Sequence, residues 1–196
     1  AASVRIVSVT RVCVLRSGGD FEPRHVQWLA QQVPGLVCLS DQRIAGVKTI
    51  PLAQDWPGWW AKMAAFGPSI SGDMLLIDLD TVVLRLPSLP TETTVLRDFT
   101  RPDRTGSGFM YVTAEDRAQV WEAFTADPKG HMRRHAGEGD QGFLCEHLAS
   151  AARWGDNVRS YKVHCRSRVP DGTDVVCFHG KPRPWQVAEK WIPPLP

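Results

Sequence analysis

The sequence has neither a long hydrophobic run nor an excess of charge of one sign. Its apolar stretches stay well below the roughly 18 residues that a membrane-spanning helix needs. There are 23 lysines and arginines against 21 aspartates and glutamates, a formal net charge of +2. The densest basic stretch, residues 153–168, is interrupted by Asp156 and by apolar residues. The sequence therefore indicates neither a transmembrane segment nor the basic surface of a nucleic-acid-binding protein.

Cysteine is scarce, and its spacing matches no metal or disulfide motif. The five cysteines are an odd number and include no C-x-x-C pair, which argues against a zinc knuckle and against a disulfide framework. They are Cys13, Cys38, Cys145, Cys165 and Cys177. Most lie within apolar runs, where a free cysteine behaves as a small core residue. Together with the absence of a recognisable signal peptide, this pattern predicts a protein of a reducing compartment, the cytoplasm.

Short apolar segments alternate with helical patterns, which is typical of an α/β fold. The 196 residues are enough for one domain with a sizeable core, so we expect a single domain over residues 1–196. Residues 182–196 are rich in proline and are expected to form an irregular tail. The segments expected to be strands are 4–15, 36–39, 47–52, 74–77, 81–84, 95–99, 109–112 and 175–178, and the expected helices are 23–32, 59–66, 114–124 and 141–152.

Polar side chains follow several of the predicted strands. Asp41, Asp78, Asp80 and His179 each stand at such a strand end, and ligands of open α/β sheets gather outside the carboxyl ends of the strands. Two carboxylates spaced i, i+2 repel each other unless a cation compensates both. Oxygen ligands suit Mg²⁺ or Mn²⁺, and an added imidazole favours Mn²⁺. Asp78 and Asp80 therefore predict a divalent-cation site. The alternative is a turn at a strand end with two solvated acids.

Five segments together resemble a known family. Residues 72–83, Gly-Asp-Met-Leu-Leu-Ile-Asp-Leu-Asp-Thr-Val-Val, resemble the D-x-D segment of family 8-like retaining glycosyltransferases. Four more segments follow that family's order: Trp60–Met63, Gly106–Met110, Asp140–Gln141 and Phe178–Trp185. The resemblance implies a GT-A-like fold with a mixed, mostly parallel sheet flanked by helices. It also implies a nucleotide-sugar donor, with uridine as the family's usual base, and an acceptor hydroxyl that the sequence does not identify.

The same resemblance implies roles for individual residues. Asp78, Asp80 and His179 would bind Mn²⁺ or Mg²⁺, while Asp140 and Gln141 would face the sugar as the catalytic pair. Gln141 would stabilise the oxocarbenium-like centre, with the donor phosphate as the base for the acceptor hydroxyl. The residues implied to contact the donor are Lys62, Lys181, Asp41, Gly18, Leu79 and Ser107.

Four positions leave alternatives open or depart from the family's pattern within this scheme. Lys181 and Arg183 compete for the phosphate role, and Asp41 could cap the next turn instead of contacting the nucleotide. Gly106 stands where the family usually has asparagine, which removes one expected sugar contact.

Two other functions fit parts of the sequence. In a haloacid-dehalogenase-like phosphatase, Asp78 would be the nucleophile and Asp80 the acid, but this reading gives His179 no role. A non-catalytic GT-A-like domain would bind nucleotide or sugar without turnover. Clustered unpaired polar groups are costly to keep without a ligand, which favours the transferase over the inactive domain.

Overall fold

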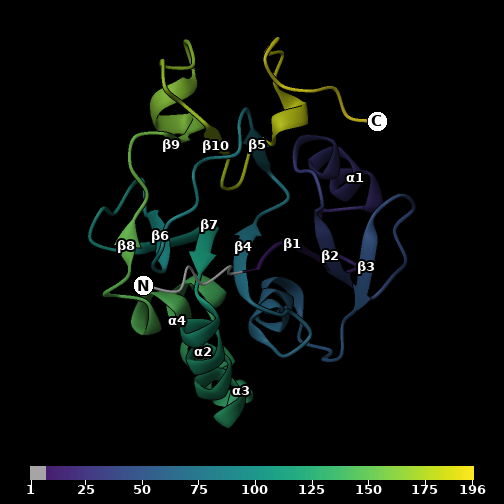
Figure 1. Ribbon diagram of the computed structural model, residues 1–196, viewed down its shortest axis with the longest axis vertical. Helices are drawn as coiled ribbons and strands as arrows, with labels where there is room; N and C mark the ends of the chain where they lie inside the picture. The colour runs from purple at the N-terminus through teal and green to yellow at the C-terminus, as the bar shows by residue number, and fades with distance from the viewer. Residues whose placement is uncertain (1–7) are drawn as a thin grey trace, which may run out of the picture.

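The computed structural model describes residues 8–196 and consists mainly of a seven-stranded sheet with helices on both faces (Figure 1). The start of the first predicted strand, residues 4–7, lies outside the described residues. The strands are β1 Val9–Leu15, β2 Val37–Ser40, β3 Lys48–Pro51, β4 Asp73–Ile77, β5 Thr81–Val83, β6 Thr94–Arg97, β7 Thr105–Val112, β8 Ala152–Arg153, β9 Val158–Ser160 and β10 Val175–Cys177. The α-helices are α1 Pro23–Gln32, α2 Ala114–Ala126, α3 Pro128–Arg134 and α4 Asp140–His147.

The large sheet has the strand order β3-β2-β1-β4-β7-β6-β8. Strands β3, β2, β1 and β4 run parallel, as do β6 and β8, whereas β7 runs antiparallel to both of its neighbours. The sheet is therefore mixed and mostly parallel, as predicted. Because β1, β2 and β4 run in the same direction, their carboxyl ends meet at one edge.

Strand β4 illustrates why central strands of the sheet have continuous apolar sequences. All five of its residues are buried, because the sheet is covered on both faces. Leu75 and Ile77 belong to one hydrophobic cluster, which includes Trp28 of α1 and Phe178. Met74 and Leu76 belong to the other, which packs beneath α2, α4 and the 3₁₀-helical segment 58–66. The side chains of β4 thus alternate between two cores, as the pleat of a strand requires.

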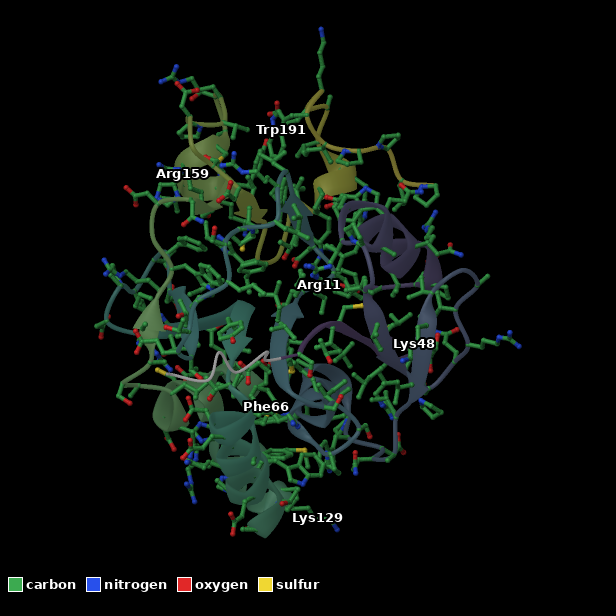
Figure 2. All side chains as sticks on the ribbon, viewed as in Figure 1. Arg11, Lys48, Phe66, Lys129, Arg159 and Trp191 are labelled. Carbon is green, nitrogen blue, oxygen red and sulfur yellow. The ribbon has the colours of Figure 1, made fainter. Side chains whose placement is uncertain are left out.

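The helices begin and end where the sequence provides signals. Pro23 is the first residue of α1, where its missing N–H costs nothing, and the Glu22 N–H donates to His25 Nδ1 at 2.8 Å. Helix α2 starts after Thr113, whose hydroxyl accepts from the Asp116 N–H at 3.2 Å. The predicted short helix at 59–66 is a 3₁₀ helix over Gly58–Phe66, with Phe66 completely buried (Figure 2).

One predicted helix is partly wrong. The expected helix 141–152 ends at His147, and Ala152 and Arg153 form strand β8 instead. The Ala152 N–H donates to the Thr93 carbonyl at 3.0 Å, which fixes this segment against β6. Pairing with a sheet edge thus overrides the local helical pattern, a tertiary effect that propensity cannot express.

A second, three-stranded sheet of order β5-β10-β9 lies at the end of the molecule opposite α2 and α3 (Figure 1). Strand β10 is antiparallel to β5 and parallel to β9. The sequence did not predict this separate sheet, and His179 therefore reaches the edge of the main sheet from a different sheet.

The proline-rich segment 182–196 contains only one short 3₁₀ turn, Pro184–Gln186. It packs against the cluster that contains Trp28 of α1, where Trp191, Ile192 and Leu195 are partly buried. Figure 2 labels Trp191 in this segment. The Trp28 indole N–H donates to the Pro193 carbonyl at 2.9 Å. None of the helices within residues 8–196 is long and apolar enough to cross a membrane.

Candidate functional site

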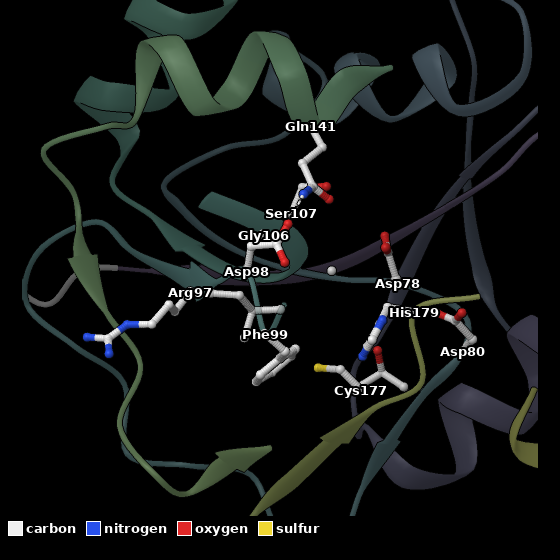
Figure 3. A pocket seen from close by; sticks show the side chains of 13 residues that line it. Asp78, Asp80, Arg97, Asp98, Phe99, Gly106, Ser107, Gln141, Cys177 and His179 are labelled. Carbon is white, nitrogen blue, oxygen red and sulfur yellow. Dashed lines mark hydrogen bonds between the residues drawn. The ribbon is translucent and has the colours of Figure 1, made fainter. Parts of the chain in front are cut away.

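A pocket opens where the carboxyl end of β4 meets β7, β6 and β10 (Figure 3). It combines acidic, amide, imidazole and aromatic side chains with backbone from two glycines of β7. Its lining residues are Asp78, Asp80, Thr81, Leu96, Arg97, Asp98, Phe99, Gly106, Ser107, Gly108, Gln141, Cys177 and His179. Five of the predicted site residues therefore share one cavity: Asp78, Asp80, Ser107, Gln141 and His179.

Asp78 follows β4 directly and is held by the neighbouring strand and by a lysine. Its N–H donates to the Gly108 carbonyl of β7 at 2.9 Å. Its carboxylate pairs with Lys62 Nζ at 2.8 Å. Burial raises the pKa of Asp78 to about 6, and the nearby charges of Asp80 and Asp140 add to this effect against the opposing charge of Lys62.

Lys62 connects three groups of the site. Its ammonium lies 2.8 Å from Asp78 Oδ1 and 3.2 Å from Asp140 Oδ2, and it donates to the Ser107 hydroxyl at 3.3 Å. That hydroxyl in turn donates to Asp140 at 3.0 Å. Burial lowers the pKa of Lys62, but the two carboxylates raise it by more, so the ammonium stays charged at neutral pH. Two acids thus share one cation.

Two glycines of β7 make room at this place. A Cβ on Gly108 would lie 3.4 Å from Asp78 Oδ2, so the strand passes close beside that carboxylate. A Cβ on Gly106 would lie 3.0 Å from the Cβ of Leu96 on the paired strand β6. This crowding is a physical reason for glycine at position 106, where the resembling family usually has asparagine.

Asp80 is buried and is paired with Arg183. The Arg183 Nη1 group donates to Asp80 Oδ2, and the Gly180 N–H donates to the same oxygen at 3.3 Å. The Phe178 N–H donates to the Asp80 carbonyl at 3.3 Å, which fixes the segment after β10 against the D-x-D segment. Neither of the two candidate phosphate-binding residues lines the pocket, but Arg183 pairs with Asp80, which does, whereas Lys181 is exposed.

His179 has an unusual backbone conformation for a residue with a side chain, with φ of +35°. Its ring stacks on Phe99 with centroids 5.5 Å apart, and its Nε2 lies 2.6 Å from the Ser160 hydroxyl. The carbonyl of His179 accepts from Lys162 Nζ at 3.0 Å. Desolvation and the charge of Lys162 lower the pKa of His179, which favours the neutral imidazole that binds metal ions.

Asp140 and Gln141 lie at the start of α4, as predicted. Gly139, which precedes them, has φ of +65°, and a Cβ there would lie 2.4 Å from Trp59 Nε1. A glycine is therefore required both for the backbone conformation and for the contact with Trp59. The Gln141 side-chain amide donates to Asp98 Oδ2 at 3.1 Å, and both residues line the pocket.

The remaining predicted donor-contact residues lie outside the pocket lining. Asp41, after β2, accepts from the Ser17 N–H at 2.9 Å and from the Ser17 hydroxyl, and it thereby fixes the loop that contains Gly18. Burial opposes this effect, but the hydrogen bonds from Ser17 together lower the pKa of Asp41. Gly18 is exposed with φ of +88°. The side chain of Leu79 is buried in the core, so only its backbone is available to a ligand.

The predicted metal ligands share the pocket but do not form a preassembled cage. Among residues 8–196, no three His, Cys, Asp or Glu side chains are grouped closely enough to hold a metal ion. Each aspartate is instead neutralised by a side-chain cation, Lys62 on Asp78 and Arg183 on Asp80. Two carboxylates and a neutral imidazole are nevertheless a donor set that suits Mn²⁺. The residues therefore fit a divalent cation in their chemistry, provided that Arg183 leaves Asp80.

The sequence analysis missed two residues of the pocket lining: Asp98, which accepts from Gln141, and Phe99, which stacks on His179. Although burial opposes it, hydrogen bonds from the Thr100 N–H and hydroxyl lower the pKa of Asp98. The expected strand 95–99 placed Asp98 inside a strand, whereas β6 ends at Arg97, so that Asp98 follows a strand as Asp78 does.

Comparison with known proteins establishes the fold. No protein-family model matches the chain, and no curated protein resembles it in sequence. Solved structures do match. The glycosyltransferase GlyE of Streptococcus pneumoniae TIGR4 superposes over 91% of this chain with a TM-score of 0.64 at 12% sequence identity. Its apo form superposes over 91% with a TM-score of 0.59 at 12% identity.

The galactosyltransferase LgtC, solved in complex with donor and acceptor sugar analogs, superposes over 90% of this chain with a TM-score of 0.59 at 13% identity. The chain spans 57% of the GlyE chain and 89% of the LgtC chain. At this level of identity the likeness concerns the fold and not the activity. The chain therefore has the mixed α/β fold of GT-A-like glycosyltransferases.

Proposed function

We propose that the chain is a metal-dependent glycosyltransferase that moves a sugar from a nucleotide-diphosphate donor to an acceptor hydroxyl. We propose a UDP-sugar as the donor. The observation that carries this proposal is the shared pocket of Asp78, Asp80, His179, Ser107 and Gln141. These residues come from four separate segments of the chain. The GT-A-like fold and the ordered sequence resemblance support the same reading.

Asp78, Asp80 and His179 would hold Mn²⁺ or Mg²⁺. When bound, such an ion neutralises charge on the donor diphosphate as the bond between sugar and phosphate breaks. Lys62 adds positive charge beside Asp78, and Arg183 and Lys181 belong to the segment expected to contact the phosphates. These cations would stabilise the leaving diphosphate.

Asp140 and Gln141 would face the donor sugar. Lys62 and Ser107 hold the Asp140 carboxylate, and Asp98 holds the Gln141 side chain, so both are oriented before a ligand arrives. We propose transfer with retention, in which Gln141 stabilises the positive charge that develops on the sugar. The donor phosphate would then accept the proton of the acceptor hydroxyl.

We further propose a cytoplasmic location. In support, all five cysteines are free thiols, and four of them are buried in the hydrophobic core. A reducing compartment keeps such thiols unpaired.

A thermal-shift panel of nucleotide sugars and free nucleotides, each with and without Mn²⁺, tests the proposal. Ligand at about 100 times its dissociation constant stabilises a fold by roughly 2.7 kcal/mol, which is readily measured. We expect a UDP-sugar to raise the melting temperature only when Mn²⁺ is present. Release of UDP in the presence of a matching acceptor would then demonstrate turnover.

Other outcomes of the same panel favour the alternatives. Stabilisation by Mg²⁺ with a phosphate mimic, and by no nucleotide, would favour the phosphatase. Nucleotide binding without turnover on any acceptor tested would favour the non-catalytic domain. The GT-A-like fold and the proximity of His179 to the acidic pair speak against the phosphatase.

A further inference from the structure

Arg183 is held in place by three groups at once. Its Nη1 donates to Asp80, its Nη2 lies 3.6 Å from Asp20 Oδ2, and its guanidinium lies 4.6 Å above the ring of Phe21. The Arg183 side chain is only 16% exposed and that of Asp80 only 7%. A charge pair so well shielded from water is screened little by salt and is strong if its geometry is good.

The backbone around Arg183 is also fixed. Pro182 and Pro184 flank it, its N–H donates to Gln186 Oε1 at 2.8 Å, and Pro184 begins a 3₁₀ turn. A change of partner at this position therefore involves the side chain, because the backbone has little freedom. Asp20 and Phe21 belong to the loop after β1, so Arg183 connects that loop to the D-x-D segment.

One of the two carboxylate oxygens of Asp80 already has two hydrogen-bond donors. Asp80 Oδ2 accepts from both Arg183 and the Gly180 N–H. A divalent cation on this carboxylate would have to share it with a guanidinium of the same sign of charge, and charges of like sign repel most strongly where water is excluded. A cation therefore binds Asp80 fully only after Arg183 has moved to another anion.

We propose that Arg183 is a positioning residue that couples binding of the divalent cation to binding of the donor. In the free chain it competes with the cation for Asp80. The diphosphate of the nucleotide sugar accepts the guanidinium and so releases Asp80 to the cation. This inference rests on the proposed function and adds to it a specific order of charge exchange. Because coupling is reciprocal, each ligand strengthens the binding of the other.

The test measures Mn²⁺ affinity directly, through the electron paramagnetic resonance signal of free Mn²⁺, and does not depend on turnover. Affinity is measured with and without saturating UDP for the unmodified chain and for Arg183→Gln, Arg183→Lys and Arg85→Gln. Arg85 is the control for loss of an arginine–aspartate pair outside the site. Its Nη2 lies 2.6 Å from Asp174 Oδ1, neither residue lines the pocket, and its side chain is 72% exposed, against 16% for Arg183.

In the unmodified chain we expect UDP to tighten Mn²⁺ binding at least about tenfold, within the usual range of coupling between sites. In Arg183→Gln, Mn²⁺ alone should bind several-fold more tightly, Mn²⁺ with UDP more weakly, and the effect of UDP should fall toward onefold. Arg183→Lys keeps the charge but loses the planar fork, so its coupling should be intermediate. Arg85→Gln should match the unmodified chain.

A folded Arg183→Gln variant whose Mn²⁺ affinity and UDP effect equal those of the unmodified chain would overturn the inference, as would weaker binding of Mn²⁺ alone. If Arg183→Gln does not fold, as judged by circular dichroism, Arg183→Lys decides, and unchanged coupling there refutes the role. Absence of any Mn²⁺-dependent UDP binding to the unmodified chain refutes the proposed metal-dependent function together with this inference. Coupling that is present but independent of Arg183 refutes the inference alone.

Discussion

The two ends of strand β4 both carry an aspartate, but in opposite environments. At the amino end, Asp73 is buried and accepts from the Tyr111 hydroxyl and from the Ala114 N–H at 2.8 Å, which ties β4 to β7 and to the start of α2. At the carboxyl end, Asp78 is partly exposed to a pocket and pairs with the ammonium of Lys62. The partners of Asp73 are neutral, whereas Asp78 belongs to a cluster of charges.

This difference separates a structural carboxylate from one available to a ligand. Neutral donors on the backbone and on a buried phenol hold Asp73 in one arrangement, and nothing in solution replaces them. At the carboxyl end the charged partners are the side chains of Lys62 on Asp78 and Arg183 on Asp80. A metal cation can take the place of either side chain at its carboxylate, and an added anion can draw either one away. Perturbed ionisable groups in a pocket are a marker of function for this reason.

Asp80→Asn would change the charged end of β4 most strongly. The amide keeps an acceptor for Arg183 and Gly180 but removes the negative charge that a cation requires. We expect Mn²⁺-dependent nucleotide binding to weaken by about 100-fold or more. Calorimetric titration with UDP and Mn²⁺ measures this loss. Binding with an unchanged metal requirement would show that Asp80 is not a metal ligand.

Gln141→Ala addresses the same pocket without touching its charges. The side chain contacts Asp98 and is proposed to face the sugar, so donor binding should persist while kcat falls by about 100-fold. Steady-state rates with the donor identified by the thermal-shift panel provide the measurement. Full activity in this variant would remove Gln141 from the reaction.

Asp73→Ala should affect stability and leave the site unchanged. It leaves the buried Tyr111 hydroxyl and the Ala114 N–H without their acceptor, at a cost of about 2 kcal/mol in the free energy of unfolding. Urea denaturation measures this cost, and Asp73→Asn, which keeps one acceptor, should lose less. If Asp73→Ala weakens nucleotide binding by as much free energy as it removes from folding, the two ends of β4 do not have separate structural and ligand-binding roles.

The smallest expected effect is a pH dependence at the amino end. Burial, with the hydrogen bond and charge of Asp73, raises the pKa of Tyr111 to about 12, above its ordinary value near 10. The folded chain therefore holds this proton more tightly than the unfolded chain. Its stabilising contribution is complete below about pH 10 and is lost as the pH rises toward 12.

The melting temperature of the unmodified chain should accordingly fall more between pH 9 and pH 12 than that of Tyr111→Phe. The comparison of the unmodified chain with this variant cancels the titration of the lysines and of the other tyrosine, Tyr161. Parallel curves would mean that Tyr111 titrates normally.

Much of the local structure was predictable because its causes lie in neighbouring residues. Pro23 and the Pro34-Gly35 pair delimit α1, and the run Met74–Ile77 predicts a strand buried on both faces. The predicted D-x-D segment lies at the end of that strand, and the structure brings Asp78, Asp80 and His179 to one pocket. Helix α3, Pro128–Arg134, was missed although Asp127 caps it and proline begins it.

Other features depend on residues far apart in the sequence. The end of α4 at His147 results from pairing of Ala152 with β6. The second sheet forms because β10 pairs with both β5 and β9. Neither partner strand can be identified from local periodicity, because a strand pattern does not specify its neighbour.

The sequence by itself determined the α/β class, the buried central strand, and the identity of the acidic pair with its candidate imidazole. These follow from patterns within about a dozen residues, where side-chain periodicity and turn chemistry act. Only the tertiary structure decided which charges neutralise one another. Arg183 and Asp80 are 103 residues apart in the sequence, and their pairing depends on how the segment after β10 packs against the end of β4. Electrostatic partners are set by distance in space, and for residues so far apart that distance exists only once the chain has folded.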